Sequence, residues 1–137
     1  MRGPGKSLPD TNVIIRYLIR DDEPLYVKAK AFFDGVNNGT AKVVIIESVI
    51  AECIYVLTKV YKVPRNEAAA SLIAILHYKG IANYDRRELI RALTLFSERN
   101  IDIVDCILCS KAASAEAHLF SFDDALNKIS ASWSRWQ

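Results

Sequence analysis

Four acidic residues stand in or beside apolar runs, and their placement constrains this chain more than any other feature of its sequence. They are Asp10, Glu52, Asp105 and Asp123. Glu52 is the only charged residue in the segment SVIAECIYVLT, and neither Asp105 nor Asp123 has a lysine or arginine nearby in its apolar run. Removing an unpaired carboxylate from water is unfavourable by several kcal/mol. The pattern therefore predicts a bound metal ion that neutralises these acids.

Length and composition indicate one ordinary globular domain over residues 1–137, with 51% hydrophobic and 25% charged residues. The formal charge of +2 neither requires nor excludes a polyanionic partner. All three cysteines lie in apolar helical patterns, which predicts buried thiols in a reducing compartment. No segment has the length and apolarity of a membrane span or a signal peptide, so we expect a soluble, cytoplasmic protein without a membrane partner.

Helical segments alternate with short β-branched runs along the chain. We expect strands that end at Asp10 and cover 42–46 and 119–122. Helices are expected from about 12 to 19, from Asp22 to an end near 35–39, and over 48–61, 64–80, 85–99, from Asp102 onward and after 123. This order predicts an α/β fold, a three-layer α/β/α sandwich around a small parallel sheet. Ligands bind beyond the carboxyl ends of parallel strands, so the four acids could converge on one edge.

Four sequence blocks carry a resemblance to a known family. The segments PDTNVIIRYLIRDD, ESVIAECIYVLTKVYKV, LFSERNIDIVDCILCSKA and HLFSFDDALNKI resemble, in order and spacing, the blocks of PIN-domain ribonucleases, most closely VapC-type toxins. The resemblance implies RNA cleavage with Mg²⁺ or Mn²⁺, a homodimer, and neutralisation by a small antitoxin protein. It implies that the four acids form the catalytic and metal-binding set, with Thr11 and Asn12 supporting Asp10, and Ser121 supporting Asp123.

Metal-ion chemistry agrees with this resemblance, because hard divalent ions prefer carboxylate and water oxygens. We expect Asp10 and Asp105 to be direct ligands, and Glu52 to be a ligand or to orient the attacking water. Asp123 is expected to be an outer ligand or to contribute to a second metal. The predicted reaction is metal-assisted hydrolysis of RNA phosphodiester bonds. Without metal, the crowded carboxylates should raise the pKa of at least one of them.

Two residues have alternative roles. Asp102 could share a helical face with Asp105 and support the site, although it suits the N-cap of the helix better. Arg16 could contact a substrate phosphate or form an ion pair with one of the acids.

Three other segments have structural interpretations. Asp85 and Glu88 have the spacing of a capping box. The first expected strand has Leu8 as its only core candidate, so it should be short or altered. Trp133 and Trp136 should cover an apolar surface or contact another chain.

Two other functions share the expected fold. One is a housekeeping RNA-processing nuclease, which would lack a neighbouring antitoxin gene and would not arrest growth when expressed alone. The other is a catalytically silent PIN-like module that only binds RNA or a partner protein. Such a module should show no stabilisation by metal, because only a bound ion favours the folded state.

Overall fold

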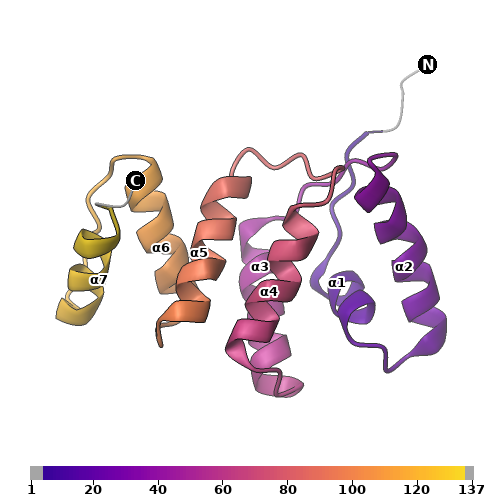
Figure 1. Cartoon of the computed structure of the whole chain (residues 1–137), viewed down its shortest axis with the longest axis horizontal. Helices are drawn as coiled ribbons and strands as arrows, with labels where there is room; N and C mark the ends of the chain where they lie inside the picture. Colours follow the sequence, from indigo (N-terminus) through magenta and orange to yellow (C-terminus); the bar gives the residue numbers. More distant parts are fainter. Residues whose placement is uncertain (1–4, 135–137) are drawn as a thin grey trace.

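The computed structural model describes residues 5–134, and helices dominate this part of the chain (Figure 1). The elements are α1 (Thr11–Leu18), α2 (Glu23–Asn38), α3 (Glu47–Tyr55), the π-helical turn η1 (Val56–Val60), α4 (Arg65–Leu76), α5 (Arg86–Glu98), α6 (Ile103–Ser114) and α7 (Asp124–Ser134).

Helix α2 begins and ends at the signals visible in its sequence. The Asp22 carboxylate accepts a hydrogen bond from the Leu25 N–H at 3.1 Å, and Pro24 lies in the first turn, where its missing N–H is harmless. At the other end, Gly39 adopts a left-handed conformation with φ of 87°. These predicted boundaries are confirmed.

The expected capping box at the start of α5 is wrong. Asp85 occupies the N-cap position, but its side chain makes no capping hydrogen bond. It instead accepts a hydrogen bond from the Asn83 amide at 2.9 Å. Glu88 accepts hydrogen bonds from Lys111, at 3.0 Å, and from the Ser114 hydroxyl. Because charged and hydroxyl donors from α6 reach Glu88, tertiary contacts replace the local motif.

The predicted three-layer α/β/α sandwich is also wrong, because residues 5–134 contain no β-strand. Only two isolated parallel bridges remain, between Ser7 and Val43 and between Val43 and Ile81. The Asn83 side chain forms two hydrogen bonds with the Ile45 backbone, as a neighbouring strand would. It accepts a hydrogen bond from the Ile45 N–H at 2.9 Å and donates one to the Ile45 carbonyl at 2.7 Å.

The first and last expected strands show why no sheet forms. Leu8 is 63% exposed and Pro9 has no N–H to donate, so the first segment pairs through Ser7 alone. A stable sheet needs neighbours that pair over several residues. The segment 119–122 is therefore not the buried strand that its composition predicts, and Phe120 and Phe122 are 81% and 94% exposed.

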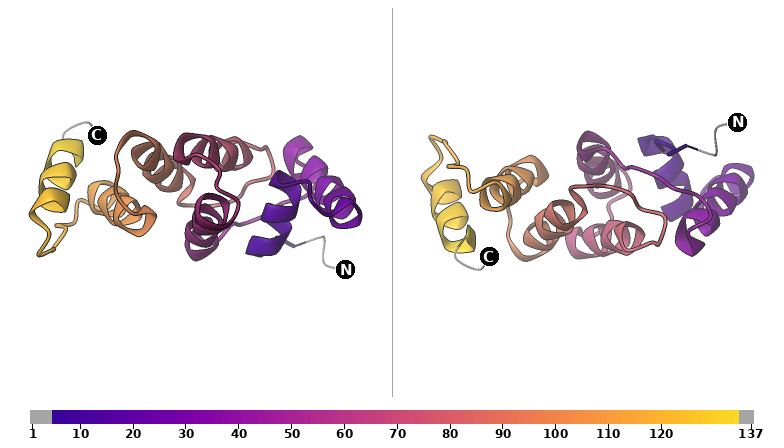
Figure 2. Two further views of the ribbon diagram at one scale, coloured as in Figure 1. Left: turned by 90° about the horizontal axis from the view of Figure 1, so that it is seen from below. Right: turned by 90° about the horizontal axis from the view of Figure 1, so that it is seen from above.

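The helices stand side by side from α1 and α2 at one end to α7 at the other (Figures 1 and 2). One cluster of buried residues runs through them and includes Phe33, Ile50, Leu72 and Leu93. The half-buried Trp133 packs against this cluster, whereas Trp136 lies outside the described residues. No helix in the described part is both long and apolar enough to cross a bilayer.

The cysteines are buried and free, as predicted. Burial raises the pKa of Cys53 and of Cys106 to about 12. Both thiols therefore stay protonated near neutral pH and are poor nucleophiles and metal ligands. This agrees with a structural role for the pair Cys106 and Cys109 rather than a metal site.

Candidate active site

Asp10 lies at the N-terminus of α1. It is exposed, and its carboxylate accepts a hydrogen bond from the Val13 N–H at 3.0 Å. One carboxylate oxygen therefore caps the helix, and the carboxylate faces solvent at the positive end of the helix dipole. Thr11 and Asn12, predicted to support Asp10, occupy the first turn of the same helix.

Glu52 and Asp10 both lie near Cys53. Burial is the largest cause of the raised Cys53 pKa, and the negative charges of Glu52 and Asp10 raise it further. A hydrogen bond with the Thr11 side chain acts in the opposite direction. Asp10 and Thr11 at the start of α1 and Glu52 in the middle of α3 therefore all lie near Cys53. We call Asp10 and Glu52 the N-terminal acidic pair.

A second group lies at the start of α6 and before α7. The pKa of Asp105 is raised above its ordinary value, mainly by burial and then by the negative charges of Asp102 and Asp123. The neighbouring carboxylates therefore contribute to the raised pKa, as the expected crowding requires, but burial is the larger cause. We call Asp102, Asp105 and Asp123 the C-terminal acidic group.

Asp123 is held by a local turn. Its carboxylate accepts a hydrogen bond from the Leu126 N–H at 3.1 Å, and its own N–H donates to the Ser121 hydroxyl at 3.0 Å. The Asn127 amide donates to the Ser121 carbonyl at 2.9 Å. Ser121 thus supports Asp123 structurally, and Asn127 is a further supporting residue that the sequence reasoning missed. Its position one helical turn after Asp123 is the signal that could have identified it.

The expectation that the acids are buried is wrong. Asp10, Glu52 and Asp123 are exposed and Asp105 is half-buried, because all but Glu52 lie at or near helix starts. Within residues 5–134, no three His, Cys, Asp or Glu side chains come together as a metal-binding group. The donor type still suits Mg²⁺, which is usually held by one or two carboxylates and completed by water and phosphate oxygens.

Arg16 forms an ion pair, but with an acid outside the predicted set. Its guanidinium donates to Asp21 at 2.8 Å, and the Tyr61 hydroxyl donates to the other oxygen of Asp21 at 3.1 Å. The Arg16 Nε is buried and has no hydrogen-bond partner. Unsatisfied buried donors of this kind are uncommon in folded proteins.

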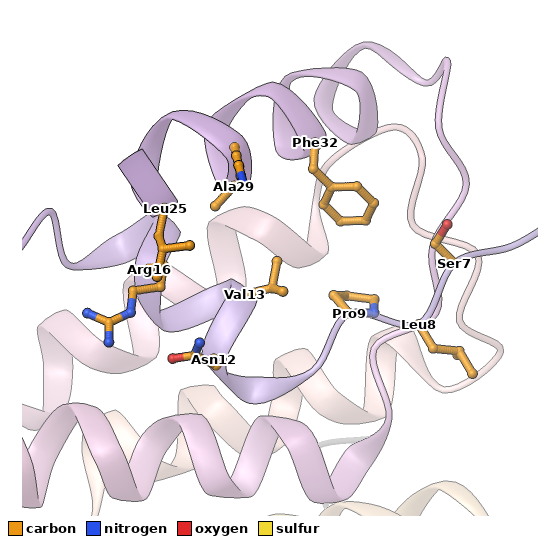
Figure 3. A pocket seen from close by; sticks show the side chains of 10 residues that line it. Ser7, Leu8, Pro9, Asn12, Val13, Arg16, Leu25, Ala29 and Phe32 are labelled. Carbon is orange, nitrogen blue, oxygen red and sulfur yellow. The ribbon is translucent and has the colours of Figure 1, made fainter. Parts of the chain in front are cut away.

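A pocket of about 380 Å³ lies between α1 and α2 (Figure 3). Pro9 and Asn12, which flank Asp10 closely in the chain, both line it. The sequence analysis did not identify this pocket, because its walls come from two helices whose mutual packing is not encoded locally. The lining residues are Ser7, Leu8, Pro9, Asn12, Val13, Arg16, Leu25, Lys28, Ala29 and Phe32.

Comparison with known proteins identifies the class. The sequence profile of the PIN domain matches residues 7–131. This chain therefore belongs to the PIN domain family, whose members are generally nucleases. No curated protein and no solved structure matches the chain.

We expect Lys111→Met to lower the free energy of unfolding by about 1 kcal/mol at neutral pH. Lys111 lies 3.0 Å from both Glu47 and Glu88 and joins α3, α5 and α6. This modest value allows for solvent screening, since the Lys111 side chain is 43% exposed. Urea denaturation of both proteins measures the difference, and Lys128→Met, at another exposed lysine, is the control.

The same substitution should matter less in acid. Burial alone would raise the pKa of Glu88, but hydrogen bonds from Ser114 and Lys111 outweigh it and lower the pKa. A lowered carboxyl pKa stabilises the fold above the ordinary glutamate pKa, and this contribution disappears as the pH falls through the lowered value. The difference in the free energy of unfolding between wild type and Lys111→Met should therefore become smaller in acid. A difference that grows as the pH falls would contradict this assignment.

Proposed function

We propose that this chain is a metal-dependent endoribonuclease that hydrolyses RNA phosphodiester bonds, and that it is the toxin of a type II toxin–antitoxin pair of the VapC type. The match of the PIN domain profile to residues 7–131 is the observation that carries the proposal. The chemistry of the acidic side chains supports it, because carboxylates are the ligands that Mg²⁺ and Mn²⁺ prefer.

The proposed roles follow the positions of the acids. Asp10 and Asp105 are the direct metal ligands, and Glu52 binds metal or orients the attacking water. Asp123 is the outer ligand, kept in place by Ser121. Asp102 raises the negative charge around Asp105 and favours cation binding there. When bound, the divalent ion would lower the pKa of water and stabilise negative charge on the phosphate.

The raised pKa of Asp105 supports this assignment, because it means that the charged form of Asp105 is disfavoured in the folded protein. Protonation relieves repulsion among the carboxylates of the C-terminal acidic group, and a cation would relieve it in the same way. Groups with perturbed pKa values concentrate at functional sites, although structural ion pairs also perturb them.

A catalytically silent PIN-like module is the second candidate. One observation favours it: within the described residues, no three His, Cys, Asp or Glu side chains come together as a metal-binding group. A housekeeping nuclease differs from a toxin only in its cellular context. Growth arrest on expression, relieved by a protein encoded next to this one, would support the toxin.

The proposed partners are RNA, a small antitoxin protein and a second copy of the chain, acting in the cytoplasm. The family resemblance is the basis for these partners. Analytical ultracentrifugation of the purified chain measures the oligomeric state.

The deciding experiment is cleavage of total RNA by the purified protein with Mg²⁺, with Mn²⁺ and with excess EDTA. We expect cleavage with either ion and its loss in EDTA, because water without a metal is a much weaker nucleophile. Restoring the ion should restore cleavage, which separates metal removal from irreversible unfolding. Equal cleavage in EDTA would contradict the metal dependence, and a purified protein that cleaves under no condition and is not stabilised by metal would favour the silent module.

A further inference from the structure

We propose that the pocket between α1 and α2 binds one nucleotide of the RNA chain, with the base in the apolar hollow and a phosphate at Arg16 and Lys28. This inference rests on the proposed function, which it deepens by assigning a substrate subsite beside Asp10. The observations that carry it are the shape of the pocket, the charges of its lining and its position.

The walls of the pocket suit a flat, apolar ring. Val13 comes from α1, and Leu25, Ala29 and Phe32 come from one face of α2, so apolar side chains face each other across the hollow (Figure 3). Nucleobases stack on aromatic side chains such as Phe32 irrespective of base identity. A volume of about 380 Å³ lies within the range of small-ligand sites.

The charged groups in the lining favour a nucleotide over an apolar peptide segment. Arg16 and Lys28 both line the pocket, and none of the described lining residues is acidic. Arg16 stands at the opposite end from Pro9 and Phe32 in Figure 3. The Arg16 and Lys28 side chains give this lining a positive charge, which a phosphate complements and an apolar side chain does not.

The position of the pocket connects it to the acids. Pro9 and Asn12 contribute to its wall, and Asp10 stands between them in the chain. A nucleotide held there places a neighbouring phosphodiester close to Asp10. The pocket would then position the strand, while the acids carry the chemistry. Phe32 and Lys28 are thus positioning residues for the substrate.

The test measures binding of the four ribonucleoside 5′-monophosphates in EDTA, where no cleavage is expected. Nuclear magnetic resonance of the Val13 and Leu25 methyl groups reports occupancy of the pocket itself. The matching nucleosides and ribose 5-phosphate test the base and the phosphate separately. N-acetylphenylalanine amide represents an apolar peptide side chain.

Two variants test the contacts with the phosphate and with the base separately. Lys28→Glu should weaken nucleotide binding about tenfold and leave nucleosides unaffected, because it removes one charge-assisted contact. Phe32→Leu should weaken nucleotides and nucleosides about fivefold through lost stacking, and leave ribose 5-phosphate unaffected. Lys79→Glu, at an exposed lysine that does not line the pocket, makes the same charge change and should have little effect.

Several results would overturn the inference. One is an equal loss of nucleotide affinity in Lys79→Glu, and another is that the pocket methyl signals do not change when nucleotides are added. A third is a response to N-acetylphenylalanine amide alone, which would indicate a site for a partner protein. Metal-dependent RNA cleavage with the same KM in wild type, Lys28→Glu and Phe32→Leu would reject the subsite and leave the nuclease standing. If nucleotide binding depends on Lys28 but RNA is cleaved under no metal condition, the proposed nuclease activity is rejected and the proposed nucleotide site is retained.

Discussion

The Asp10→Asn variant is expected to lose RNA cleavage by about 100-fold or more, beyond the loss typical of residues that only support a metal ligand. Its fold should remain intact. Asparagine caps helices as well as aspartate does, so the hydrogen bond from the Val13 N–H can be kept while the negative charge is lost. Initial rates with Mg²⁺ and urea denaturation of the same preparations measure the two quantities.

Asp22→Asn is a closely matched control. Asp22 caps α2 as Asp10 caps α1, accepting a hydrogen bond from the Leu25 N–H at 3.1 Å against 3.0 Å for Asp10 and Val13. Both substitutions remove one negative charge from a helix N-terminus. Only Asp10 belongs to the proposed site, so Asp22→Asn should cleave at close to the wild-type rate. Cleavage retained in Asp10→Asn would remove Asp10 from the mechanism.

Gly80→Ala should lower the free energy of unfolding by about 3 kcal/mol or more. A methyl group at Gly80 would lie 2.0 Å from the Ala41 carbonyl oxygen and 2.8 Å from that of Val36. The Gly80 N–H also donates to the Val36 carbonyl at 2.7 Å, and its carbonyl accepts from the Val43 N–H at 2.9 Å. The backbone must therefore move apart at the point where the turn after α4 meets the end of α2.

Chemical denaturation measures this change, and Gly5→Ala is its control. A methyl group at Gly5 meets no atom within 4 Å, so that substitution should be nearly neutral. If Gly80→Ala proves too unstable to purify, its yield of soluble protein against Gly5→Ala still gives the sign of the effect. A Gly80→Ala protein as stable as wild type would show that this close approach of the two segments is wrong.

The candidate site was predictable in composition but not in arrangement. The acids are conspicuous because they interrupt apolar runs, and burial, followed by the negative charges of Asp102 and Asp123, raises the pKa of Asp105. Their burial was overestimated, since an apolar run places its neighbours near the core without burying every side chain. The pocket beside Asp10 was missed altogether, because Val13 and Phe32 face each other only after α1 packs on α2.

The resemblance and the local structure point in different directions. The PIN domain profile spans residues 7–131, yet the described chain forms only the two bridges at Val43 instead of a sheet. The departure was visible at Leu8 and Pro9, whose segment lacks the apolar residues and the N–H donors of a central strand. The absence of a strand at 119–122 could not be predicted, because nothing in that segment indicates whether a neighbouring strand exists to pair with it.

The sequence by itself determined where the helices form, since their backbone hydrogen bonds join residues only a few positions apart. Asp22, Pro24 and Gly39 delimit α2 without help from distant residues. Tertiary structure alone decided the extent of strand pairing, the exchange of the capping box for the contacts of Glu88 with α6, and the grouping of the acids. Each of these depends on partners tens of residues away, and a local pattern specifies what a segment can bind but not which partner reaches it.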